Sequence, residues 1–178
     1  MARGNMLLVL TGVLAMFLVG CSQQGTEEQV VVESLARFPA DSPEGLVETS
    51  TAEYDAEMSA DGQGSLRILA AEPMTVALYE TGDLDVERAK LIYRAQLRCE
   101  DLDGAAYLEM WCSFGEEDEY FSRGIESPIS GTIEWTPREV PFFLEAGQNP
   151  TNVRLNIVID GTGTVWVDDL QVLRGTLP

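Results

Sequence analysis

The sequence contains no histidine, a single lysine, and no apolar run as long as a membrane-spanning helix. Without imidazole, the chain is excluded from Ser-His-Asp and Cys-His catalysis, from histidine-ligated haem and from the usual zinc sites. Acidic residues outnumber basic ones 30 to 11, and the net charge is −19. Because nucleic acid is bound through lysine and arginine, we expect no nucleic-acid partner. Carboxylates alone suffice for glycoside hydrolysis, but no pair of them stands out.

The N-terminus carries an uncharged apolar run, Met6 to Leu18, behind one positive residue, Arg3. A membrane-spanning helix needs about 20 apolar residues, so this run fits the shorter core of a secretory signal. It leads into Leu18-Val19-Gly20-Cys21, which resembles the lipobox of bacterial lipoproteins. The resemblance implies cleavage before Cys21 and a diacylglycerol group on its sulfur. The alternatives are a membrane anchor and an ordinary cleaved signal.

The lipobox resemblance also predicts the location and the domain organisation. Residue Ser22 stands where an aspartate would follow the cysteine, which implies the outer membrane if the host has one. Residues 1–20 are then the signal peptide, residues 21–34 the lipidated cysteine and a flexible tether, and residues 35–178 one folded domain. The 158 residues left after cleavage are a usual size for one domain.

The rest of the chain has the pattern of short strands separated by turns. Turn-forming residues recur about every ten positions, and apolar and polar residues alternate between them. Lys90–Cys99 and Ala105–Cys112 are expected to form a hairpin around Asp101–Gly104, and two later strands to form another around Asp160-Gly161. The apolar parity changes at Asp168-Asp169, which predicts a β-bulge there. Short strands at this spacing predict an all-β sandwich or barrel.

Four segments resemble the galactose-binding-like jelly rolls, the superfamily that includes many carbohydrate-binding modules. Gly163-Thr-Val-Trp-Val-Asp-Asp-Leu-Gln-Val172 resembles their closing strand, and Asp61-Gly-Gln-Gly-Ser-Leu-Arg-Ile68 an early strand. Tyr93–Arg98 with Gly104–Leu108 is similar to their central hairpin. The resemblance implies a single jelly-roll β-sandwich. It says less about function, because such folds host glycan binders, protein binders and structural modules.

The same resemblance implies a structural calcium ion. In many members of the superfamily the first aspartate of the closing strand is a ligand, and the matching residue is Asp168. Asp41 and Glu44 are expected to supply further oxygens, since calcium takes six to eight of them. The sequence lacks an N-terminal ligand motif of the Asn-Gly-x-Glu kind. The alternative is a bulge aspartate that accepts hydrogen bonds from the backbone.

Glycan binding by such modules uses aromatic rings with amide and charged neighbours. Strand alternation places Tyr107, Glu109 and Trp111 on the face away from the core. Trp166 and Asn156 are expected to join them if the loop between their strands has an odd length. These five residues are the candidate ligand site. The alternative is that the aromatic rings are packed under loops rather than exposed.

Cys99 and Cys112 are an even pair in an exported protein, which ordinarily favours a disulfide. With a four-residue loop at Asp101–Gly104, however, Cys99 faces Ala106, and Cys112 lies roughly 20 Å further along the strand. A disulfide needs Cα atoms within about 7 Å. The sequence therefore predicts two buried free thiols.

Together these observations predict a lipid-anchored, exported, non-catalytic protein of the cell envelope. Its membrane contact is the lipid on Cys21, and a polysaccharide is the leading ligand by resemblance alone. The second hypothesis is a structural or accessory lipoprotein that docks an envelope protein. The third is a hydrolase that uses carboxylates only.

Overall fold

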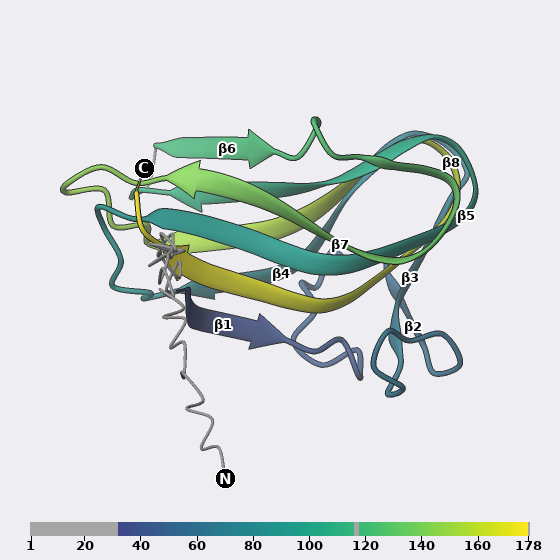
Figure 1. The fold of residues 1–178 in the computed structure, drawn as a ribbon. Coiled ribbons are helices and arrows are strands. Elements are labelled where there is room, and N and C mark those ends of the chain that lie inside the picture. Colours follow the sequence, from purple (N-terminus) through teal and green to yellow (C-terminus); the bar gives the residue numbers. More distant parts are fainter. Residues whose placement is uncertain (1–31, 116–117, 178) are drawn as a thin grey trace, which may run out of the picture.

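The computed structural model describes residues 32–115 and 118–177, so the predicted signal peptide, Cys21 and most of the tether lie outside it. Eight strands make up the fold (Figure 1): β1 Glu33–Phe38, β2 Glu53–Asp55, β3 Ser65–Ala70, β4 Met74–Gly82, β5 Lys90–Ser113, β6 Glu119–Arg123, β7 Ile129–Phe143 and β8 Asn152–Gly175. All regular structure in these two ranges is β, as predicted. None of the described segments forms an apolar helix that could span a bilayer.

Two long strands organise the molecule. β5 and β8 contain 24 residues each and run antiparallel along their whole length, from Lys90 opposite Gly175 to Ser113 opposite Asn152. Figure 1 shows the pair bending sharply at one end of the molecule, so that each strand continues from one layer into the other. The bend is where the register shifts, between Glu100 and Asp103.

The shorter strands complete the two layers on either side of this ribbon. In the first layer β1 pairs with the end of β8 and β7 with the start of β5, which gives the order β1-β8-β5-β7. In the second layer β4 pairs with the start of β8 and β6 with the end of β5, which gives β4-β8-β5-β6. β3 pairs with β8 beside the bend, and β2 pairs with β3. The arrangement is a jelly-roll sandwich.

The core lies between the two layers and follows the predicted alternation. On β5 the inward residues are Leu91, Tyr93, Ala95 and Leu97 before the bend and Ala106, Leu108, Met110 and Cys112 after it, all at most 1% exposed. Val153, Leu155, Ile157 and Ile159 of β8 pair with the second of these sets and are fully buried. Each large apolar side chain buried in this way contributes about 1.5 to 3 kcal/mol, so the register is strongly specified.

The prediction of two hairpins was wrong. Asp101–Gly104 and Asp160-Gly161 are corners inside the continuous strands β5 and β8, and they face each other, with Gly104 opposite Gly161. The glycines are required because the two backbones nearly touch: a Cβ on Gly104 would lie 2.1 Å from the Asp160 carbonyl oxygen. Turn-forming residues at a sheet corner therefore gave the same signal as a hairpin loop.

Two other local predictions are confirmed. β8 carries one extra residue where Gln96 pairs with Asp168 and Arg94 with Gln171, and Asp169 there has a φ of 45°. Cys99 and Cys112 are buried free thiols. The register argument for the thiols was wrong, since both lie on β5, opposite Val165 and Val153 of β8.

Candidate functional site

The outer face of the second layer brings polar and aromatic side chains of four strands together in rows. One row contains Ala77 of β4, Asn156 of β8, Glu109 of β5 and Arg123 of β6 as direct cross-strand neighbours. The rows on either side of it are Glu80, Arg154, Trp111 and Phe121, and Thr75, Val158 and Tyr107. Alternation along each strand produces this face, because the residues between them point into the core.

The face is hollowed along the strand direction. One hollow of about 400 Å³ is lined by the Glu109 row and by Glu80, Arg154 and Trp111 of the next row, with Val47 and Thr49 on its margin. A second, of about 360 Å³, is lined by Tyr107, Val158 and Asp160. Thr75 and Arg123 line both hollows, so the two are adjacent. We call this combined surface the face furrow.

Glu109 is the centre of the furrow and is only 2% exposed. Its Oε1 accepts hydrogen bonds from Trp111 Nε1 at 2.7 Å and from Asn156 Nδ2 at 2.9 Å. Its Oε2 accepts one from Arg123 Nε at 2.5 Å. Three side chains from three strands are thus held by one carboxylate. Such networks fix side-chain positions before a ligand arrives.

The pKa of Glu109 is lowered despite burial. Burial alone raises it, but the hydrogen bonds from Asn156, Arg123 and Trp111 favour the charged form more strongly. The carboxylate is therefore ionised at neutral pH. A general acid of a hydrolase needs the opposite shift, so Glu109 is unsuited to that role.

Two groups in the furrow retain hydrogen-bonding capacity. Asn156 is 4% exposed, and its Oδ1 has no partner within the described residues. Arg154 lies over the Trp111 ring at 5.6 Å, and its nearest carboxylates are Glu119 at 3.7 Å and Glu80 at 4.0 Å. Its guanidinium makes ion pairs but no hydrogen bond in the part of the chain described.

The aromatic residues of the furrow differ from the predicted platform. Trp111 is half-buried and packs on Phe121 with ring centres 4.8 Å apart, with Arg154 over the ring. Phe121 is 49% exposed and is the open ring of this row. Phe121 and Arg123 were missed in the sequence because β6 is only five residues long, although its Phe121-Ser122-Arg123 alternation was a usable signal.

Trp166 does not join the furrow. It is 6% exposed, donates from Nε1 to Asp55 Oδ2 at 2.9 Å and lies under the Arg98 guanidinium. Trp166 pairs with Arg67 of β3, beyond the bend of β8 from Asn156. The prediction depended on a loop between the strand of Asn156 and the strand of Trp166. That loop does not exist, because β8 is continuous through the corner.

Asp168 is fully buried beside the loop that precedes β3. Its Oδ2 accepts from Ala60 N at 2.8 Å and its Oδ1 from Asp169 N at 2.7 Å, which is the bonding pattern of a bulge aspartate. Burial raises its pKa, and the negative charges of Asp61 and Asp41 raise it further. Asp41 Oδ1 is buried and has no hydrogen-bond partner among the described residues.

The predicted calcium ligands are therefore only partly assembled. Asp41 and Asp168 are close enough to interact electrostatically, whereas Glu44 is exposed. In residues 32–115 and 118–177 no three acidic, cysteine or histidine side chains gather as a metal site. Asp41 and Asp168 would be the protein ligands of a calcium ion here, which stays a prediction.

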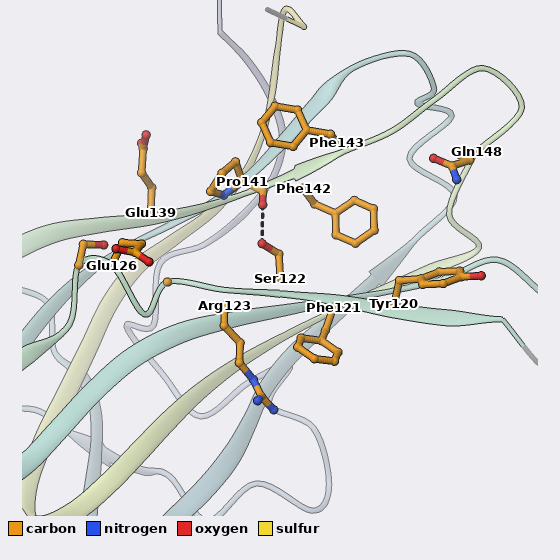
Figure 2. Close-up of a pocket in the computed structure, with 12 residues that line it drawn as sticks. Tyr120, Phe121, Ser122, Arg123, Glu126, Glu139, Pro141, Phe142, Phe143 and Gln148 are labelled. Atoms are coloured by element: carbon orange, nitrogen blue, oxygen red, sulfur yellow. Dashed lines mark hydrogen bonds between the residues drawn. The ribbon is translucent and has the colours of Figure 1, made fainter.

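A further hollow, of about 690 Å³, lies at the edge of the sandwich between β6 and β7 (Figure 2). Its lining includes Tyr120, Ser122, Phe142, Phe143 and Gln148. The sequence gave no prediction for it, because it is formed by two strands of different layers. We call it the edge hollow.

Comparison with solved structures finds the same fold in carbohydrate-binding modules. No protein family profile matches the chain, and no curated protein sequence matches it. The CBM22-1 xylan-binding domain of Paenibacillus barcinonensis Xyn10C matches over 83% of this chain and 95% of its own, at 12% identity and a TM-score of 0.52. A family 16 carbohydrate-binding module-2 matches over 70% of this chain and 86% of its own, at 9% identity and a TM-score of 0.52.

A larger protein matches in the same way. The CBM22-1 and GH10 modules of Clostridium thermocellum Xyn10B, solved with xylohexaose, match over 82% of this chain and 28% of theirs, at 15% identity and a TM-score of 0.55. At such low identities the likeness concerns the fold. The chain has the jelly-roll fold of carbohydrate-binding modules, as its sequence motifs predicted.

Proposed function

We propose that the protein is a non-catalytic, lipid-anchored envelope protein that binds a polysaccharide in the face furrow. The observation that carries the proposal is the Glu109 network, which holds Trp111, Asn156 and Arg123 around a hollow. Asn156 Oδ1 and the Arg154 guanidinium offer an acceptor and donors that no described residue satisfies. Sugar hydroxyl groups supply both kinds of partner.

The shape of the furrow favours an extended glycan. From Arg154 to Asp160 it follows six residues of β8, which is roughly 20 Å at the strand rise of about 3.3 Å per residue. Both hollows are open, which admits the interior of a long chain as well as its end. The matching solved modules include a xylan-binding domain, which supports a polysaccharide ligand without naming the one bound here.

The charge of the chain favours a neutral glycan over an anionic one. Glu80, Glu119 and Asp160 lie at the furrow with Arg123 and Arg154, and the protein as a whole carries a net charge of −19. Anionic polysaccharides would be repelled by this field. Neutral sugars are recognised by hydrogen bonding and ring contacts, which the field does not oppose.

Binding to immobilised xylan and other neutral polysaccharides tests the proposal. Wild-type protein is expected to bind with a dissociation constant in the millimolar to micromolar range, as one or two ring contacts and a few hydrogen bonds give. Arg154→Gln should weaken binding about tenfold, and Arg174→Gln, which breaks a comparable ion pair at 3.7 Å outside the furrow, should not. Absence of binding to every neutral polysaccharide tried would refute the glycan proposal and favour protein docking.

A further inference from the structure

The edge hollow has the features of a second ligand site. It lies between β6 and β7, the outermost strands of the two layers, and its volume of about 690 Å³ exceeds that of either hollow of the face furrow. Figure 2 shows the Phe142 ring in the gap between these strands, with Tyr120 and Gln148 at one end. Ser122 spans the gap by donating from Oγ to the Pro141 carbonyl at 2.6 Å.

Exposed aromatic side chains are concentrated here. The lining of the edge hollow includes Tyr120 at 56% exposure, Phe143 at 52% and Phe121 at 49%. They are three of the eight large apolar side chains exposed in the described residues. Clustered exposed apolar groups mark interaction sites more often than scattered ones do.

The rings of the edge hollow are supported from below. Phe114 packs against Tyr120 with ring centres 6.0 Å apart and against Phe142 at 6.3 Å. Phe114 itself packs against the buried core. A neighbouring ring therefore holds Tyr120 and Phe142 in position, which reduces the side-chain entropy that is lost when a ligand binds.

Polar groups with spare capacity surround these rings. Gln148 Oε1 accepts from Glu145 N at 2.8 Å, which orients the amide, and its Nε2 has no acceptor in the part of the chain described. The Ser122 hydroxyl still has lone pairs to accept a hydrogen bond, and the Tyr120 hydroxyl has no described partner. Rings combined with an amide and hydroxyl groups suit a polyhydroxylated ring rather than a purely apolar surface.

A peptide strand is a poor occupant of this edge. The Pro141 carbonyl accepts from Ser122 of β6, so residue 141 directs its backbone polar groups toward the hollow. Pro137 lies four residues earlier on the same strand. Because backbone direction alternates along a strand, the polar backbone group of Pro137 points to the same side as that of Pro141. Proline has no N–H, so this edge lacks two of the donors that an added strand would need.

An anionic occupant is also disfavoured. Glu126 and Glu139 line the edge hollow, and Glu139 is already paired with Arg94 at 2.8 Å. Arg123, the one basic lining residue, points away from β7 in Figure 2 and bonds Glu109 in the face furrow. The lining thus offers no uncommitted positive charge to a carboxylate or phosphate.

We propose that the edge hollow is a second carbohydrate site, which stacks a neutral pyranose on Tyr120 and Phe142 and bonds it through Gln148 and Ser122. The inference rests on the proposed glycan binding by the face furrow. β6 is the common wall, since Arg123 lines the edge hollow and both face hollows, and Phe121 lines the edge hollow and packs on Trp111 of the furrow. Two contacts on one protein raise its avidity for a polysaccharide above its affinity for a short oligosaccharide.

Nuclear magnetic resonance titration separates the two sites. The full mature chain, in a detergent without sugar headgroups, is titrated with xylohexaose while the side-chain NH₂ signals of Asn156 and Gln148 are followed. Both signals are expected to shift with their own dissociation constants. Tyr120→Ala should weaken the Gln148 response about tenfold and leave the Asn156 response unchanged. Arg154→Gln should do the reverse.

Control variants keep the result interpretable. Leu69→Ala removes a side chain that is 75% exposed outside both sites and should change neither signal. Phe143→Ala is a second test of the edge if Tyr120→Ala proves poorly folded. An Asn156 shift without a Gln148 shift overturns the edge site while the face furrow stands. No shift of either signal, with xylohexaose or with oligosaccharides of the other neutral polysaccharides tried, refutes both. Self-association in sedimentation that Tyr120→Ala abolishes would show the edge to be a protein contact and overturn the carbohydrate assignment.

Discussion

Replacing Glu109 by glutamine should loosen the whole face furrow. Glutamine keeps one oxygen that accepts from Trp111 and Asn156. Its NH₂ group, however, faces the Arg123 Nε, so that two hydrogen-bond donors meet without an acceptor. Losing one charge-assisted hydrogen bond costs about 1.5 to 3 kcal/mol. Since the Arg123 side chain is 42% exposed and can be hydrated instead, we expect about 2 kcal/mol. For a domain of this size that lowers the melting temperature by roughly 4 to 8 °C.

The effect should depend on pH with a defined sign. The folded-state pKa of Glu109 is lowered, so the charged form stabilises the fold above the ordinary glutamate pKa of about 4.3, and this contribution is lost as the pH falls through the folded-state value. The difference in free energy of unfolding between wild type and Glu109→Gln should therefore have its full size at pH 7 and become smaller in acid. Glu80→Gln is the control, because its ion pair at 4.0 Å is partly exposed and is worth under about 1 kcal/mol.

Urea unfolding of the three proteins at pH 7 and at two acidic values measures these differences. A Glu109→Gln curve that coincides with the Glu80→Gln curve at pH 7 would refute the reasoning. A stability difference between wild type and Glu109→Gln that grows in acid would also refute it, because the carboxylate would then be destabilised rather than stabilised by its neighbours.

Three further predictions test other parts of the molecule. Cys21→Ser should release the protein from membranes, and metabolic labelling with a fatty-acid analogue should mark wild type but not the variant. Chelation should lower the melting temperature and Asp168→Ala should abolish that sensitivity, whereas identical curves in chelator and millimolar calcium would leave Asp168 as a bulge residue. Gly104→Ala should destabilise the fold by roughly 3 kcal/mol or more in thermal unfolding, because residue 104 has a φ of +126° and the added Cβ would clash with the Asp160 backbone. Gly147→Ala is the control: residue 147 has a φ of +82° but open space around it, so the loss of stability should be clearly smaller.

The sequence predicted what depends on alternation along one strand. The buried and exposed sets of β5 and β8, the bulge at Asp168-Asp169 and the shared face of Glu109 and Trp111 all follow from the alternation of side chains, which a single strand carries by itself. Parity does not say which strand lies opposite, so it could not show that Glu109 would bond Arg123 of β6.

The errors share one physical origin, the sheet corner. Gly104 and Gly161 permit two backbones to approach at a bend, and the same residue types permit a chain to reverse in a hairpin. Only the pairing partner distinguishes the two cases. Reading a corner as a loop placed Trp166 on the furrow side, whereas the continuous strand carries it past the bend to Asp55. The edge hollow was beyond prediction because its walls come from different layers.

The position of β8 after the other seven strands in the sequence has a consequence for how the fold is completed. β8 pairs with β1, β3, β4 and β5, so both layers require a strand that is synthesised after the other seven. Contacts of this kind, such as Lys90 opposite Gly175, close long loops and slow folding. If the protein is exported N-terminus first, as the proposed function requires, neither layer can be completed before β8 has crossed the membrane.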